Sequence, residues 1–271
     1  MKLDTLRLPS WEDIPEVPGM PHGCIWGMFD QGGQRDQLGT LNLLTPMTVM
    51  KAKEEIQTGE SVCLNWGFEH PQTPGVNRKK FSHSIISLRH LGYVAYDDEV
   101  SINTQSGSQW DGFRHWGHQA TGLHYNDLPH DDITDLKCKD NSIHYWSERG
   151  GIVGRGVLID YHSWAVANNV EHPAIRRTPL TVADIERVAQ HQGVQFRQGD
   201  ILIIRTGWTE WYNNSTGEEQ AAGTQGNEHI GLDSTEETVK SLWSRHFAAV
   251  ASDTLAFEAW PTQPPYSETL C

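Results

Sequence analysis

Three short apolar runs constrain the fold of this chain more than any other feature. They span Gly156 to Tyr161, Asp200 to Thr206 and Phe247 to Ser252. Runs of this length, bounded by polar residues, are typical of strands buried inside a domain. We therefore expect three buried strands in the second half of the chain.

Helix signals lie between and before these strands. The segment Thr181 to Gln192 begins with a capping residue, carries Asp184 three positions later and is followed by Gly193. This is the pattern of a capped helix that ends at a glycine. Thr235 to His246 predicts a second helix, and Thr45 to Gln57, with Pro46 in its first turn, predicts a third. Strands and helices together predict a mixed α/β fold.

The rest of the sequence shows no boundary between domains. Ser61 to Trp66 and Phe81 to Leu91 are predicted as further strands, and the polar insertion from 213 to 229 is expected to be mobile or to pack on a partner. An irregular N-terminal arm covers about residues 1–25. Because no segment looks long enough to be a linker, we expect residues 1–271 to form one domain with this mixed β-core and flanking helices.

The chain is acidic, and its charge narrows the choice of partners. It has 35 acidic and 21 basic side chains, which gives a formal net charge of −14. Such a surface repels phosphate backbones and anionic lipids, so neither nucleic acid nor a membrane is an expected partner. No run approaches the roughly 20 apolar residues of a membrane span. The N-terminus lacks the apolar segment of a secretory signal, so we predict a cytoplasmic protein.

A polar, glycine-containing stretch from Asn103 to His115 is the most promising site. Asp111 and His115 lie four residues apart, and the carboxamides of Gln105 and Gln109 precede them. A carboxylate can orient an imidazole or hold a cation, and an imidazole can move a proton near neutral pH. Asp111 and His115 are therefore our candidate catalytic residues.

This stretch resembles the signature of the cyclase family, a group of metal-dependent hydrolases that includes kynurenine formamidases and isatin hydrolases. The signature runs His-x-Gly-Thr-His-x-Asp-x-Pro-x-His. Gln105 and Gln109 stand at its first two His positions, Asp111 at its Asp and His115 at its last His. The Gln-Trp-Asp-Gly form is similar to a branch common in fungi and some bacteria. Four other segments resemble the same branch, in the expected order: Gly39–Pro46, Arg155–Asp160, Gly199–Trp208 and Ala256–Pro261.

The resemblance implies a swivelling β/β/α architecture, a homodimer or larger homo-oligomer, and a bound zinc or manganese ion. Its metal ligands would be the first two His positions and the Asp, but Gln replaces both His here. A carboxamide oxygen is a poor ligand for these metals. The candidate ligands are therefore Asp111 and Gln109, with no cofactor at all as the alternative. We favour substrate contact for Gln105 and Gln109. The family pattern also supplies a Glu near the metal beyond the Trp-Pro segment, where Glu268 is the candidate in a short C-terminal end.

Aromatic residues around these polar segments predict a pocket for a small aromatic or apolar substrate. Trp66 and Trp110 are candidate wall residues. Tyr125 and Asn126 match a pair in the same branch and are expected to line the pocket.

Two more titratable residues belong to the candidate site. His118 lies three residues after His115 and would share a face with it if this segment is helical. Glu258 lies between aromatic residues, as either a desolvated acid with a raised pKa or a salt-bridged structural group.

Three functions fit these residues. The first is hydrolysis of a C–N amide or a lactone or other cyclic bond by a metal-bound water, with His115 carrying the proton; as a reaction class, hydrolysis is the one we choose. The second is metal-independent cyclisation, dehydration or isomerisation of a secondary metabolite, with His115 and Asp111 doing acid–base work. The third is a non-catalytic binding protein derived from the family.

Overall fold

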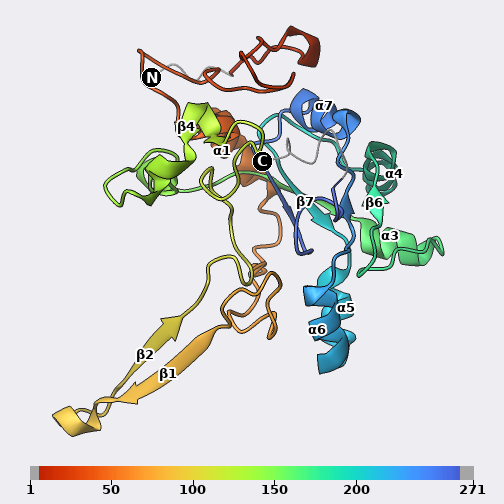
Figure 1. Ribbon diagram of the computed structural model, residues 1–271. Helices are drawn as coiled ribbons and strands as arrows, with labels where there is room; N and C mark the ends of the chain where they lie inside the picture. The colour runs from red at the N-terminus through yellow and green to blue at the C-terminus, as the bar shows by residue number, and fades with distance from the viewer. Residues whose placement is uncertain (1–5, 263–271) are drawn as a thin grey trace. The chain divides into compact units, whose positions relative to one another are not determined.

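The computed structural model describes residues 6–262, so Glu268 and the C-terminal end lie outside the described residues (Figure 1). The chain forms two compact units. Unit 1 comprises Met1–Gly59, Asp111–Trp208 and His229–Cys271, and unit 2 comprises Glu60–Trp110 and Thr209–Glu228. A compact unit is not by itself an independently folding domain, so the single domain over 1–271 stays a prediction.

The centre of unit 1 is a parallel sheet of three strands in the order β5-β7-β9. These are β5 (Gly156–Asp160), β7 (Ile201–Arg205) and β9 (Ala249–Ser252). Alternate side chains of β5 and β7 are buried, as expected when one face of each strand packs on a helical layer. All three predicted strands are present, but only β5 and β7 bury side chains as expected, because β9 is half-buried along its whole length.

Helices α3 (Tyr161–Ala167) and α4 (Val182–Gln192) lie between β5 and β7 along the chain, and α7 (Glu236–Ser244) lies between β7 and β9. The predicted capping box of α4 is present, with Thr181 and Asp184 bonded reciprocally. Gly193 ends the helix at a φ of +68°, a left-handed conformation that glycine adopts without strain. Both predicted helices of this region are confirmed.

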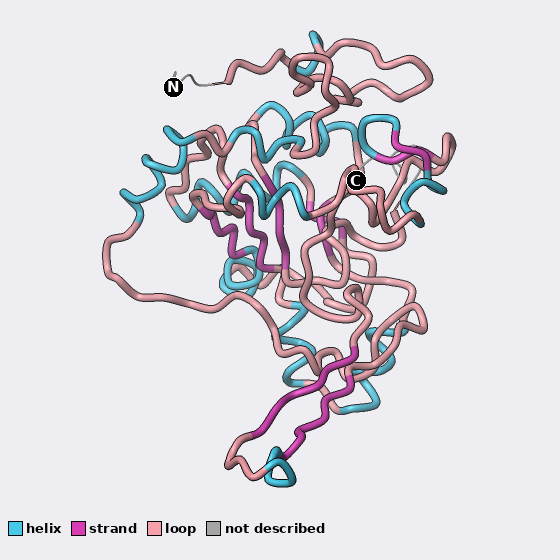
Figure 2. Tube along the Cα trace, turned by 90° about the vertical axis from the view of Figure 1, so that its left-hand side faces the viewer, coloured by secondary structure: helices cyan, strands magenta, loops and turns pink. Residues whose placement is uncertain are grey.

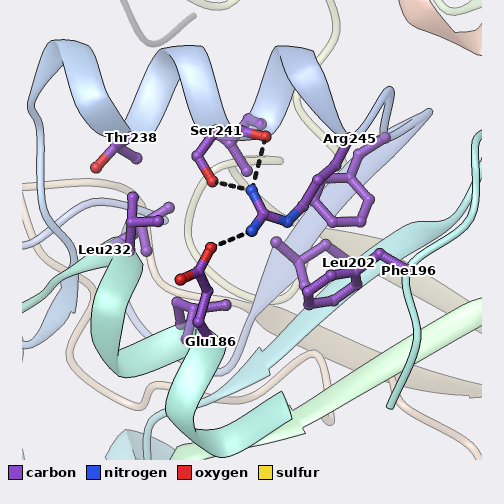
Figure 3. A pocket seen from close by; sticks show the side chains of 11 residues that line it. Glu186, Phe196, Leu202, Leu232, Thr238, Ser241 and Arg245 are labelled. Carbon is purple, nitrogen blue, oxygen red and sulfur yellow. Dashed lines mark hydrogen bonds and ion pairs between the residues drawn. The ribbon is translucent and has the colours of Figure 1, made fainter. Parts of the chain in front are cut away.

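Helices α4 and α7 are tied together by Arg245 (Figure 3). Its guanidinium pairs with Glu186 of α4, donates to Ser241 Oγ at 2.6 Å and lies 5.4 Å from the ring of Phe196. The space beside this group is about 20 Å³, which is close to one water molecule and too small for a substrate.

The rest of unit 1 consists of short elements. Helix α1 begins after the predicted cap Thr45, but it ends at Ala52 and continues as a 3-10 turn to Glu55, so it is shorter than expected. The remaining short elements are α2 (His144–Glu148), β3 (Leu123–His124) paired with β4 (Leu128–Pro129), and β6 (Pro179–Leu180) paired with β8 (Gly231–Leu232).

The described part of the N-terminal arm is irregular apart from a 3-10 turn at Trp11–Asp13. It is nevertheless packed. Trp11 and Ile14 form a buried cluster with Trp243 of α7, and the Trp243 indole N–H donates to the Pro9 carbonyl at 3.1 Å. The arm is therefore part of the core of unit 1.

Unit 2 contains an antiparallel hairpin of β1 (Ser82–Ser87) and β2 (Tyr96–Ser101), most of helix α5 (Trp208–Asn214), and helix α6 (Gly217–Gln225). The hairpin is drawn in Figure 2 as two long adjacent strands. The predicted strand Phe81–Leu91 is confirmed in its first part. Its last residues form a 3-10 turn, Leu88–Leu91.

One expectation for unit 2 is wrong. Ser61–Trp66 is not a strand, and its apolar side chains Val62 and Leu64 are 80% and 74% exposed, so no partner buries them. The polar insertion at 213–229 contains α6, because Thr216 and Glu219 form a capping box that starts a helix in spite of the low hydrophobicity. Its mobility or its packing on a partner stays a prediction.

The described elements form a mixed α/β fold, as predicted from the sequence. Within residues 6–262, no helix combines the length and the apolar character that crossing a membrane requires.

Candidate active site

Asp111 and Glu258 come together in unit 1, although 147 positions of sequence separate the signature from the last family-like segment (258 − 111). Removal from water raises the pKa of the Glu258 carboxyl, and the negative charge of Asp111 raises it further. A hydrogen bond from the Glu258 backbone N–H acts in the opposite direction. The result is a pair of interacting carboxyl groups in which Glu258 is the one that favours its neutral form.

Backbone contacts with β8 fix the position of Glu258. Leu232 N–H donates to the Phe257 carbonyl at 3.0 Å, and Ala259 N–H donates to the Leu232 carbonyl at 2.8 Å. A Cβ at Gly231 would lie 2.4 Å from the carbonyl carbon of Glu258, so only glycine permits this approach. Among residues 6–262, the Glu258 side chain has no salt bridge, so its environment is that of the desolvated acid rather than the ion-paired group.

A pair of histidines supports the loop that carries Asp111. His124 is 3% exposed, and its Nδ1 lies 3.1 Å from the Phe113 carbonyl, which can only accept, so Nδ1 carries the proton. Its Nε2 then accepts from His130 Nδ1 at 3.2 Å. Burial lowers the pKa of His124, and the nearby His130 lowers it further, so the His124 ring favours its neutral state.

Tyr125 and Asn126 line an open hollow of about 780 Å³ in unit 1. Their polar groups form hydrogen bonds with residues 27–36. The Tyr125 hydroxyl donates to Asp36 Oδ2 at 2.9 Å, and Asn126 accepts from Gly27 N–H at 2.7 Å and donates to Asp30. Burial and the Asp36 charge raise the pKa of Tyr125, so its hydroxyl stays a donor. Substrate contact by this pair stays a prediction.

His115 and His118 do not share a helical face, because residues 111–118 are not helical. His115 is exposed, and its ring centroid lies 6.3 Å from that of Trp116. His118 instead stabilises a turn, with its Nδ1 2.9 Å from Thr121 Oγ1 and its backbone N–H bonded to the Leu123 carbonyl. His118 therefore does not join His115 on a common helical face.

In unit 2 the two carboxamides of the signature are in contact. Gln109 Nε2 donates to Gln105 Oε1 at 3.3 Å. The backbone of Gln105 is fixed by Asn103 Oδ1, which accepts from its N–H at 2.8 Å, and by Arg78, which donates to its carbonyl at 3.0 Å. The signature is therefore divided, with Gln105 to Trp110 in unit 2 and Asp111 onward in unit 1.

Trp66 belongs to an aromatic cluster within unit 2. Its ring stacks on His70 at 4.7 Å and meets Tyr212 edge-on at 4.9 Å, while the Tyr212 hydroxyl accepts from Gln72 N–H at 2.9 Å. Trp110, in contrast, is 51% exposed. A role for either tryptophan in the wall of a substrate pocket stays a prediction.

The residues present do not fit the zinc or manganese ion that the resemblance implies. Two of the three ligand positions carry Gln, whose side chains bond to each other. In the described part of the chain, no group of three or more His, Cys, Asp or Glu side chains is placed to hold a metal ion.

The His124–His130 pair and the carboxylates of Asp30 and Asp36 were not predicted from the sequence. No motif spacing marks these residues, since each acts through contacts with segments distant in sequence. The sequence contained one signal for the histidine pair. In the segment 123–130, two His residues flank the candidate residues Tyr125 and Asn126.

Comparison with solved structures supports the fold. The chain is similar to a crystal structure described as a novel cyclase, with a TM-score of 0.73, 25% identity and coverage of 87% of this chain and 79% of that one. A structure of an isatin hydrolase bound to the product analogue thioisatinate gives a TM-score of 0.51 at 17% identity, covering 82% and 79%. Isatin hydrolase A from Labrenzia aggregata bound to benzyl benzoate gives 0.50 at 16%, covering 76% and 73%.

A comparison with curated proteins gave no match. The resemblance of the signature and of the later segments to the cyclase family is confirmed independently of the solved structures. Residues 68–259 match the Cyclase family, and because this range is more than half of the 271 residues, the chain belongs to that family.

Proposed function

We propose that the protein is a small-molecule enzyme that opens an amide, lactone or related cyclic bond by acid–base chemistry of Asp111 and Glu258. The observation that carries the proposal is the raised pKa of Glu258 beside the charge of Asp111. A desolvated carboxyl group that favours its neutral form, next to a second carboxyl group, is suited to act as the acid of an acid–base pair.

In the proposed step, ionised Asp111 accepts a proton from a water molecule as its oxygen attacks the substrate carbonyl carbon. Neutral Glu258 gives its proton to the leaving nitrogen or oxygen, and the bond between that atom and the carbonyl carbon breaks. The products are a carboxylic acid and an amine or alcohol. Asp111 then loses its proton and Glu258 regains one, which restores the starting state.

His115 is the proposed carrier of the proton that Asp111 loses and of the proton that Glu258 regains. Its exposed ring lies four residues from Asp111 in the signature, where the family resemblance gives a proton-transfer role to this position. The His124–His130 pair supports the step indirectly, because its bond to the Phe113 carbonyl positions the loop between Asp111 and His115.

The proposed substrates are flat and apolar, in keeping with the tryptophans around the signature. Two structures of similar fold are described as isatin hydrolases. Isatin is itself a flat cyclic amide, so a test panel would contain isatin, aryl formamides and aromatic lactones.

The test is a pH–rate profile of the wild type on this panel, followed by Glu258→Gln and Asp111→Asn. Each variant is expected to lose about a hundredfold or more in kcat/KM, the usual effect of losing a general acid or base. Activity of the wild type should fall at high pH as Glu258 ionises. In Asp111→Asn the upper limb should move to lower pH, because the charge that raises the pKa of Glu258 is gone.

Glu237→Gln is a matched control, since Glu237 is an exposed carboxyl group on α7 and has no part in the proposed step. A loss of only about threefold in Glu258→Gln would contradict the proposal. So would wild-type activity that appears only on adding zinc or manganese, because acid–base chemistry of the two carboxyls needs neither. Ring closure or isomerisation without water uptake, seen by product mass, would retain the carboxyl pair but replace hydrolysis as the reaction.

A further inference from the structure

His229 is a buried titratable residue that the proposed reaction does not use. Its side chain is only 5% exposed, and it lies in unit 1, two residues before β8. Removing a polar side chain from water costs free energy unless its polar atoms find partners. Each of the two ring nitrogens of His229 therefore needs either a partner or an open approach.

The backbone of His229 is fixed beside Glu258. The His229 N–H donates to the Trp260 carbonyl at 3.2 Å, and the Trp260 N–H donates to the His229 carbonyl at 3.1 Å. Two residues after His229, Gly231 lies against the peptide group that follows Glu258, and a Cβ there would be 2.5 Å from the Glu258 carbonyl oxygen. The segment that carries His229 is therefore packed on the segment that carries the proposed acid.

One ring nitrogen of His229 has a partner within the chain. Nδ1 lies 3.2 Å from the Ile230 carbonyl, which can only accept, so Nδ1 carries the proton. Nε2 then holds a lone pair and is an acceptor. Burial lowers the pKa of His229, and the bond to Ile230 opposes this only in part, so the ring favours the neutral form.

The other ring nitrogen, Nε2, is open to solvent. Within residues 6–262 it has no hydrogen-bond partner, yet it is not closed off from the surface. The ring of Trp260 lies nearly parallel to the His229 imidazole, at 17° and 6.5 Å between centroids, and Trp260 is 39% exposed. The two residues together provide one unused hydrogen-bond acceptor and an exposed flat aromatic surface.

We propose that His229 is a specificity-determining residue of the Glu258 site, where its Nε2 accepts a hydrogen bond from the N–H of the amide that is cleaved. The inference rests on the proposed function, because this nitrogen is the atom that receives the proton of Glu258. A nitrogen whose N–H is held by Nε2 has a fixed orientation, so its lone pair can be directed to that proton. Trp260 packs on the apolar ring of the same substrate.

A fixed acceptor distinguishes substrates by whether they donate to it. An amide with a free N–H satisfies Nε2, whereas a lactone or an N-alkylated amide leaves it unpaired. An unpaired acceptor in a closed complex should lower kcat/KM by about tenfold or more. Within the proposed reaction, amides with a free N–H are therefore the preferred substrates over lactones.

The test compares isatin with N-methylisatin, with each rate divided by that of uncatalysed hydrolysis at the same pH. The wild type should favour isatin by about tenfold or more in kcat/KM. His229→Phe keeps a ring of similar size beside Trp260 but has no acceptor, so the preference should disappear even though the space for the methyl group is unchanged. His229→Gln can place a carboxamide oxygen near the position of Nε2 and should keep most of the preference.

Thr254→Val is the matched control. The Thr254 hydroxyl donates to the same Ile230 carbonyl at 2.9 Å, so its loss disturbs the surroundings of His229 without changing Nε2. Its preference for isatin should equal that of the wild type. Circular dichroism would confirm that each variant is folded.

Glu258→Gln separates this inference from the proposed reaction. If Glu258→Gln loses activity while the wild type hydrolyses both compounds equally well, the proposed reaction stands and the role of His229 is wrong. If Glu258→Gln stays active and His229→Phe abolishes the preference for isatin, His229 contacts the substrate although the proposed acid is wrong. A preference that His229→Phe retains would overturn the inference in either case.

Discussion

Glu258 has an environment that its neighbours in the sequence only partly reveal. Flanking aromatic residues indicated desolvation, and the pKa of the carboxyl is indeed raised by removal from water. The second cause, the charge of Asp111, depends on chain segments that meet only in the folded state. An acid with a raised folded-state pKa weakens folding once it ionises.

We predict that Glu258→Gln stabilises the protein at neutral pH. The folded-state pKa lies above the unfolded value of 4.5, so stability is greatest below the unfolded value and is lost as pH rises through the folded pKa. The melting temperature of Glu258→Gln should exceed that of the wild type at pH 7.5, and the two should converge near pH 4. A melting temperature that is lower at pH 7.5 would show that ionised Glu258 makes stabilising contacts.

For single residues, the sequence predicted the chemical character of side chains better than the contacts between them. It identified Gln105 and Gln109, which the structure brings into contact, and Glu258 as a desolvated acid. It could not predict the bond from His124 to the Phe113 carbonyl or its partner His130, because neither contact follows from spacing. The catalytic and substrate-binding roles of all the candidate residues stay predictions.

At the scale of secondary-structure elements, capping residues determine where the helices begin and end. Helix α4 begins at a reciprocal capping box and ends at a left-handed glycine, and α6 has the same kind of start in a segment of low hydrophobicity. The cap satisfies backbone N–H groups that would otherwise lack partners in the first turn.

We predict that Thr181→Ala lowers the free energy of unfolding by about 1 kcal/mol, the usual effect of losing a Thr N-cap. Both the bond from Asp184 N–H to Thr181 Oγ1 and the bond from Thr181 Oγ1 to Asp184 are lost. Urea denaturation would measure the change. Gln190→Ala, an exposed position on the same helix, is the control and should change stability by less than about 0.5 kcal/mol. Equal effects would exclude the cap as the cause.

Apolar runs predicted the strands of the central sheet, and the largely exposed β1 was also predicted in its first part. In β5 and β7 alternate side chains enter the core, whereas β9 is half-buried. Ser61–Trp66 has a similar composition, but Val62 and Leu64 find no neighbour to cover them. Local composition indicates that a strand is allowed, whereas a partner decides whether it forms.

At the scale of the whole molecule, the family and the mixed α/β class were predictable because motifs resembling one family follow in order along most of the chain. The packing of the irregular N-terminal arm was not predictable from the sequence. Trp11 is 5% exposed and its ring meets His22 edge-on at 4.9 Å, so a segment without regular structure contributes to the core of unit 1.

We predict that Trp11→Ala lowers the free energy of unfolding by about 3 kcal/mol, as expected for a large buried side chain truncated in a core. The loss leaves a cavity against Ile14 and Trp243. Urea denaturation would measure it, with Trp116→Ala, at a site 41% exposed, as the control. Similar losses in both variants would mean that the arm is not a stabilising part of unit 1.

The division of unit 2 into two separate stretches has a consequence for synthesis on the ribosome. Residues 60–110 emerge well before 209–228, which supply Tyr212 for the contacts with Trp66 and Gln72. At usual translation rates the intervening stretch takes about 5 to 20 s. During that interval Trp66 is already outside the ribosome, while Tyr212, against which its ring packs, has not yet been made. We expect this period to be when the chain most depends on chaperones.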